Sequence, residues 1–294
     1  MDKADAADVY TLVAPEGRLA DYVRAMWTVD AAASPTGATE QPIVPDGCPE
    51  LIFNLGDPIH RIRGSETDVH DRTMLAGQIT GAIRLRPQGR VALVGVRLHP
   101  WAMHAFLGVG AVEIRDDIIP LEIAVSRAVR DRLEVVSPDA APSEFVGAMT
   151  EALARHVSHR PPPSAAAITV YRALRHMSHG GPTATVRSVA KSLGRSERQL
   201  QRVFEESVVL SPKLYLRMLR VQRALRLAER EPVRSWGEVS ARCGFYDQSH
   251  LTREFLQFAG CTPGMFDERA GILTRSLLLN GTEERKAGLE LKNS

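Results

Sequence analysis

The sequence predicts a multi-domain α+β protein, with a small β-barrel domain and its flanking helices first and an all-α domain second. Three observations support this prediction. Short runs of β-branched and aromatic residues, separated by Gly and Pro, fill the first hundred residues. A stretch at 212–230 has no Gly or Pro after its first residue and is rich in Leu, Arg and Ala, which predicts one long helix. A sequence pattern also occurs twice, 51 residues apart, which predicts two similar helical units.

The β-rich domain is expected within residues 1–119. Its clearest strand candidates are 22–29, 51–55 and 91–98, with turn signals at 56–58 and 86–89. Pro100 opens a short helix that Gly108 ends. Several short strands with Gly and Pro turns predict a small barrel or a sandwich.

Residues 120–165 are predicted to be a helical connector followed by a Pro-rich linker. Phe145, Met149, Leu153 and Val157 recur every fourth residue and form an apolar stripe. The stripe suits packing either on the barrel or on a second subunit, and the sequence favours neither. The three prolines at 161–163 are stiff and extended, so we place the domain boundary there. The helical domain is expected at 166–270, and a disordered tail at 271–294.

Charge is divided between the two predicted domains. Residues 1–165 hold 16 Lys and Arg against 22 Asp and Glu, a net charge of −6, whereas residues 166–270 hold 17 against 10, a net charge of +7. A basic domain attached to an acidic one is typical of a DNA-binding protein whose other domain has a different ligand.

Composition indicates an ordinary soluble protein. Hydrophobic residues make up 44% and charged residues 24%, and there is no apolar run of about 18 residues. The first ten residues are acidic and contain no hydrophobic signal region. Cys48, Cys243 and Cys261 are far apart and fit no zinc spacing, which favours a reducing compartment. We expect a cytoplasmic location and no membrane partner.

The repeated pattern is Leu-x-Arg-x-Phe, six residues, Ser or Thr, Pro, two residues and an aromatic residue. It runs from Leu200 to Tyr215 and again from Leu251 to Phe266. A short apolar helix candidate precedes each copy and ends in a glycine, Gly194 in the first. The motif residues Leu and Phe then share one face of the next helix, and polar residues with an Arg share the other. Two short helices around a Gly-containing turn form a helix-turn-helix pattern.

The starts of the second helix in each unit also carry capping signals. Ser196 with Gln199 three residues later is a capping-box arrangement, and Asp247 is the expected cap of the second unit. The polar residues on these two helices are the candidate DNA contacts: Arg198, Gln201, Arg202, Gln248, Ser249, His250, Thr252 and Arg253. Arg and Gln can each make two hydrogen bonds to a base edge, so we expect the first unit, with more long polar side chains, to discriminate sequence more strongly.

These motifs resemble the C-terminal domain of the AraC/XylS family of bacterial transcription regulators. The resemblance is carried by Gly244-Phe245-x-Asp247-Gln248-Ser249-x-Leu251-x-Arg253-x-Phe255, by Gly260-x-Thr262-Pro263, and by Leu200-x-Arg202-x-Phe204 with Ser211-Pro212. The first copy departs from the family pattern, because Val209 stands where a Gly usually precedes the Ser-Pro pair. The segment 45–53, PDGCPELIF, is similar to the opening of an uncharacterised sensory type of such regulators, which implies a cupin-like N-terminal domain.

An enzymatic N-terminal half is the alternative. Its polar candidates show no His-x-His spacing, no Gly-rich phosphate loop and no nucleophile elbow, and His99 and His104 lie five apart, on different helical faces. Cys48 is the one candidate reactive thiol, and a buried structural cysteine is the alternative. An enzyme or stress-repair protein that carries an AraC-type DNA-binding module fused to a reactive N-terminal domain is therefore the second interpretation, and a protein-binding scaffold is the third. We expect no catalytic residue, metal or cofactor.

The first interpretation is a sequence-specific transcriptional regulator that binds double-stranded DNA. Two recognition helices would read two successive major grooves, and the apolar lumen of the N-terminal domain would bind a small-molecule effector. The family resemblance implies activation through contact with RNA polymerase, and a homodimer is an open expectation.

Overall fold

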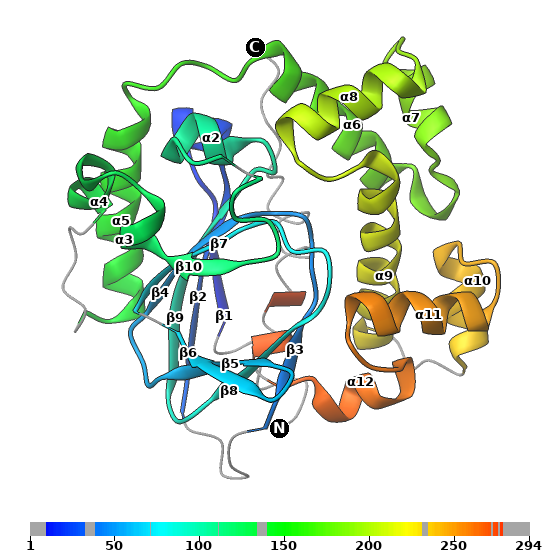
Figure 1. Cartoon of the computed structure of the whole chain (residues 1–294), viewed down its shortest axis with the longest axis horizontal. Coiled ribbons are helices and arrows are strands. Elements are labelled where there is room, and N and C mark those ends of the chain that lie inside the picture. Colours follow the sequence, from blue (N-terminus) through cyan, green and yellow to red (C-terminus); the bar gives the residue numbers. More distant parts are fainter. Residues whose placement is uncertain are drawn as a thin grey trace.

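The structure is a computed structural model that describes residues 10–32, 39–70, 72–110, 112–133, 140–230, 235–271, 273–275 and 277–278. A β-rich domain with helices on its outer side lies beside a helical domain (Figure 1). Among the described residues, no helix has both the length and the apolar character needed to cross a membrane.

The described strands form two antiparallel sheets. One has six strands in the order β1-β2-β9-β4-β7-β10, and the other has four in the order β3-β8-β5-β6. The prediction of a sheet-rich N-terminal domain is confirmed, but the two sheets are separate layers and do not close into one hydrogen-bonded barrel. The strands are β1 (Tyr10–Val13), β2 (Val23–Ala31), β3 (Gln41–Ile43), β4 (Glu50–Asn54), β5 (Ile59–Arg63), β6 (Glu66–Val69), β7 (Thr73–Ala76), β8 (Ile83–Pro87), β9 (Val91–Leu98) and β10 (Ile118–Pro120).

Strand β9 is the centre of the larger sheet, and all of its residues are buried. It pairs with β2 and β4, so that Gly95 lies opposite Trp27 and Arg97 lies opposite Glu50. A Cβ atom at Gly95 would lie 2.0 Å from the indole of Trp27, so a side chain there would displace the ring. The register thus brings a Trp, a carboxylate and a guanidinium together inside the domain.

Helices cover the outer side of the larger sheet. They are η1 (Gly17–Asp21), α2 (Ala102–Leu107), α3 (Leu121–Ala124), α4 (Arg127–Leu133) and α5 (Pro142–Val157). The apolar stripe of α5 is buried, and the rings of Phe145 and Phe53 lie 5.1 Å apart. The stripe therefore packs on the sheet, which decides between the two partners that the sequence left open.

The helical domain comprises α6 (Ala165–His179), η2 (Gly181–Thr183), α7 (Val186–Ser192), α8 (Glu197–Ser207), α9 (Pro212–Arg230), α10 (Trp236–Cys243), α11 (Gln248–Phe258) and α12 (Pro263–Arg269). The long helix predicted at 212–230 is α9, with the same bounds. It joins the first unit, α7 and α8, to the second, α10 and α11 (Figure 1). The prediction of two helical units joined by a long helix is confirmed.

The two domains touch along α9. Gly47 has φ of 81°, and a Cβ atom there would lie 2.4 Å from the ring of Tyr215 on α9, so the close approach requires glycine. Further along α9, the side chain of Gln222 donates hydrogen bonds to the carbonyls of Pro45 (2.9 Å) and Val44 (3.3 Å). The segment 44–48 therefore lies against the helix that joins the two units.

The segment after α12 also returns to the β-rich domain. Leu273 donates its backbone N–H to Oε1 of Gln41 (2.9 Å), and the hydroxyl of Thr274 donates to the carbonyl of Pro42 (2.7 Å). Leu273 and Leu278 are buried as well. The expected disorder from residue 271 therefore does not hold for these residues, because Leu273 and Leu278 each belong to a buried apolar cluster. Residues 279–294 lie outside the described part of the chain.

Candidate DNA interface

The first unit is built from α7, a glycine turn and α8. Gly194 has φ of 63°, a left-handed conformation that glycine adopts without strain. The hydroxyl of Ser196 accepts from the N–H of Gln199 (3.2 Å), and the side chain of Gln199 accepts from the N–H of Ser196 (2.8 Å). The predicted capping box is confirmed, and it fixes where α8 begins. Leu200 and Phe204 are buried, so the opposite face of α8 is turned to solvent.

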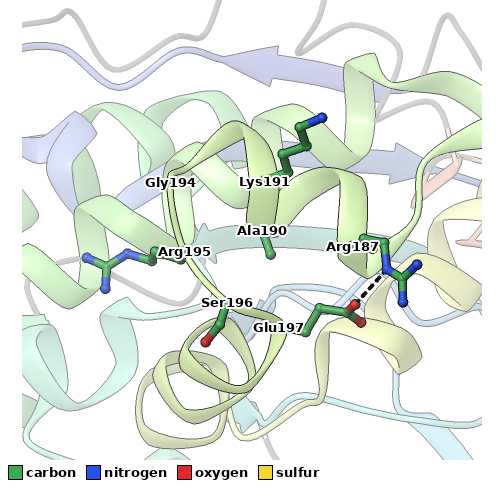
Figure 2. A pocket seen from close by; sticks show the side chains of 7 residues that line it. All are labelled: Arg187, Ala190, Lys191, Gly194, Arg195, Ser196 and Glu197. Atoms are coloured by element: carbon green, nitrogen blue, oxygen red, sulfur yellow. Dashed lines mark hydrogen bonds and ion pairs between the residues drawn. The ribbon is translucent and has the colours of Figure 1, made fainter.

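A shallow depression lies at the turn between α7 and α8 (Figure 2). Its rim carries the cationic residues Arg187, Lys191 and Arg195, and its one carboxylate is Glu197. Arg187 pairs with Glu197 at 3.1 Å, while Lys191 and Arg195 extend in other directions from the turn (Figure 2). The excess of positive charge suits a phosphate group, the part of DNA to which most protein hydrogen bonds are made.

The second unit repeats this construction with α10 and α11. Gly244 has φ of 78°, and Oδ1 of Asp247 accepts from the N–H of His250 (2.6 Å), as expected of the helix cap. Leu251 and Phe255, the motif residues, are fully buried. Of the polar residues between them, Arg253 is exposed and Thr252 half-buried, whereas Glu254 is buried.

A buried ion pair holds α11 on α9. Arg217 donates from Nε and Nη2 to both carboxylate oxygens of Glu254, at 2.9 to 3.2 Å. His250 lies beside the pair, with Nε2 at 3.6 Å from Glu254 Oε1 and Nδ1 accepting from the N–H of Tyr246 (3.2 Å). These contacts fix α11 relative to α9. They also show that His250 interacts with Glu254 and Tyr246 of its own unit.

Most of the predicted contact residues are solvent-exposed, and two are half-buried. Exposed are Arg198, Gln201, Arg202, Gln248, Ser249 and Arg253; half-buried are His250 and Thr252. On α8, Gln201 donates to Glu205 (2.8 Å) and Arg202 pairs with Glu206 (3.6 Å). On α11, the hydroxyl of Thr252 donates to the carbonyl of Gln248 (3.0 Å). The structure therefore groups these residues on two exposed helix faces.

The sequence did not predict a further exposed residue, which lies next to α11. Tyr246 is 93% exposed and directly precedes the cap of α11. An aromatic side chain this exposed at a helix start is unusual, and an aromatic residue between Phe245 and Asp247 was the available signal. The sequence also did not single out Arg187, Lys191 and Arg195 around the turn between α7 and α8. Charged residues near a turn are common on any solvent-exposed surface.

The candidate thiol and histidine of the N-terminal domain are buried. Cys48 is 6% exposed and accepts a hydrogen bond from Arg24 at 3.4 Å. His99 is stacked on Trp101 at 4.4 Å, and burial, together with the charge of Arg24, lowers its pKa to about 3. Among the described residues, no three His, Cys, Asp or Glu side chains are grouped so that they could bind a metal.

Two protein families match parts of the chain. Residues 189–269 match a family described as a helix-turn-helix domain, and residues 11–120 match one described as a domain of unknown function (DUF6597). The first match covers both units described above, apart from the first three residues of α7. The C-terminal part therefore contains a helix-turn-helix domain.

Two relatives and one solved structure are similar to this chain. The chain is 33% identical over 89 residues to the Msm operon regulatory protein of Streptococcus mutans, covering 30% of this chain and 32% of that protein. It is 35% identical over 74 residues to the transcriptional activator RhaR of Pectobacterium atrosepticum, covering 25% and 26%. Each match spans about a third of the relative's length or less. ToxT of Vibrio cholerae is similar in structure with a TM-score of 0.46 and 11% identity, covering 83% of this chain and 98% of that one. The helix-turn-helix domain of this chain is therefore similar to parts of two known transcriptional regulators.

Proposed function

We propose that this chain is a sequence-specific DNA-binding transcriptional regulator that responds to an effector. The observation that carries the proposal is the pair of equivalent, exposed reading helices, α8 and α11, joined by α9. The net charge of +7 on residues 166–270 supports the same conclusion, because a basic surface attracts the phosphate backbone.

The length of α9 suits two successive major grooves. Nineteen residues at about 1.5 Å each span roughly 28 Å, and successive major grooves are about 34 Å apart. The difference of about 6 Å is small enough for bent DNA or tilted units to take up. The reading helices would then engage two half-sites about one helical turn apart.

The contacts already made on α8 are too weak to keep it from DNA. The pairs that Gln201 and Arg202 form with Glu205 and Glu206 are exposed and span one helical turn. Such pairs contribute about 0.3–0.5 kcal/mol, whereas a bidentate contact of Arg with guanine discriminates by about 1–3 kcal/mol. A matching base therefore displaces the carboxylate. We propose that α8 supplies more of the sequence discrimination, and that Arg253 on α11 contacts phosphate.

Activation through contact with RNA polymerase is a finer proposal that rests on the family resemblance alone. A cytoplasmic location is proposed from the composition, and a homodimer is the proposed assembly. The proposed effector site is the cavity between the two sheets.

Salt dependence of DNA binding tests the proposal. For the full chain on DNA from upstream of its own operon, the logarithm of the association constant should fall linearly with the logarithm of salt concentration, by about 0.9 per phosphate contacted. Arg253→Ala should lower that slope by about one, and the control Arg127→Ala, on α4 of the other domain, should leave it unchanged. Binding that is weak and insensitive to salt would favour the scaffold interpretation.

A further inference from the structure

The two sheets enclose a cavity of about 90 Å³. Its wall is mostly apolar, with Ile52 and Leu93 from the larger sheet and Ile43, Ile59 and Leu85 from the smaller one. Apolar cavities of this kind bind small apolar molecules, and a few polar groups in the wall set their orientation. The polar groups of this wall therefore indicate the chemical class of the ligand.

The polar end of the cavity has more carboxylates than cations. Asp46, Glu50 and Arg97 all line it. Arg97 donates from Nε to Glu50 Oε1 (2.7 Å) and pairs through Nη1 with Asp46 Oδ2 (3.2 Å), so one guanidinium serves two carboxylates. Burial, opposed by Arg97 and reinforced by Asp46, raises the pKa of Glu50. A second cation near Glu50 would reduce this cost of burying its charge.

One oxygen of Glu50 is left for a ligand. Both hydrogen bonds to this carboxylate, from Arg97 Nε and from Trp27 Nε1 (3.1 Å), go to Oε1. Within the described ranges, no residue donates to Oε2, although the Glu50 side chain is only 12% exposed. A charged donor is the strongest partner for a carboxylate oxygen of this kind.

We propose that this cavity binds a small, mostly apolar primary amine, whose ammonium group pairs with Glu50 while its alkyl part fills the space between the sheets. The inference rests on the proposed function, because it assigns the effector class of that regulator. Asp46 and Glu50 belong to the 45–53 segment, so the inference also gives that sequence motif a chemical role.

The DNA-binding domain and the segment after it complete this site. Gln222 of α9 lines the cavity, and so do Leu273 and Leu277. Gln222 is hydrogen-bonded to the carbonyls of Val44 and Pro45, next to Asp46. An occupant therefore contacts the helix that joins the two reading units, which is the physical route from ligand to DNA.

The test is calorimetric titration of the full chain, without DNA, with short primary alkylamines and with the alcohols and carboxylates of the same chain lengths. An ammonium paired with a buried carboxylate should bind at least about tenfold more tightly than the matching alcohol, and the carboxylate should bind more weakly still. Failure of every amine to bind, or equal binding of the carboxylates, overturns the proposal. DNA binding is measured separately, so a chain that binds DNA but no amine overturns this inference alone.

Two variants locate the site. Glu50→Gln keeps the shape but removes the charge, so it should remove the preference for amine over alcohol, whereas the control Glu144→Gln, exposed on α5, should retain it. Leu277→Ala should shift the best amine to a longer chain, and the control Ile123→Ala, at a position 73% exposed, should not. Unchanged preference in Glu50→Gln, or an unchanged optimum in Leu277→Ala, contradicts the assignment. If Glu50→Gln fails to fold, the comparison of amine with carboxylate in the unaltered chain still decides.

Discussion

Removal of Arg217 should destabilise the helical domain more than removal of any exposed ion pair. Arg217 is the bidentate partner of Glu254, and their side chains are 27% and 7% exposed. Arg217→Ala leaves the buried carboxylate without these hydrogen bonds, with His250 Nε2 at 3.6 Å and the charge of Arg220 nearby. Breaking a fully buried pair costs about 3–5 kcal/mol, and the partial exposure of Arg217 reduces the expected loss of unfolding free energy to about 2–3 kcal/mol.

Urea unfolding followed by circular dichroism measures this loss. The matched control is Arg242→Ala, whose pair with Glu238 spans 3.6 Å with both side chains nearly half exposed, and which should cost less than about 1 kcal/mol. Arg217 also lies over the ring of Phe258, so Arg217→Ala loses packing as well. The double variant Arg217→Ala, Glu254→Gln separates the two effects and should recover part of the loss, since an amide is cheaper to bury than a charge. Equal losses in Arg217→Ala and Arg242→Ala would refute the reasoning.

Two further predictions concern the turns and the effect of pH. Gly194→Ala places its Cβ in open space, so it should lower the free energy of unfolding by about 1 kcal/mol through its left-handed backbone alone. Gly244→Ala should lower it distinctly more, because its Cβ would also lie 2.4 Å from the carbonyl oxygen of Pro182. Thermal melting of the two variants measures the difference. The pKa of His99 is about 3 in the folded chain against 6.5 ordinarily, so the unfolded chain takes up the proton first. Stability should therefore fall as pH drops below about 6.5, by about 1.4 kcal/mol per pH unit for this group, and His99→Gln should flatten that dependence in urea titrations at several pH values.

Features set by neighbours along the chain could be predicted from the sequence. The bounds of α9, the capping box at Ser196 and the cap at Asp247 depend on local propensity and on hydrogen bonds within a few residues. The burial of the motif residues Leu251 and Phe255 also follows from helical period alone.

Features set by distant contacts could not be predicted. Glu254 follows Arg253 in the sequence, yet it points inward because Arg217, 37 residues earlier, donates hydrogen bonds to both of its carboxylate oxygens. Leu273 lies beyond the last motif of the helical domain, yet it is buried in a cluster with side chains of both sheets. The cavity likewise depends on the register of β4 with β9, which no local pattern specifies.

The central claim is that two exposed helices read DNA sequence, and selection of binding sites from random double-stranded DNA tests it most directly. The full chain should enrich a site with two half-sites about one helical turn apart. Arg202→Ala should flatten base preference at one or two positions of one half-site and leave the other half-site unchanged. A pool without enrichment, or an Arg202→Ala protein that selects the same sequences as the unaltered chain, would contradict the account.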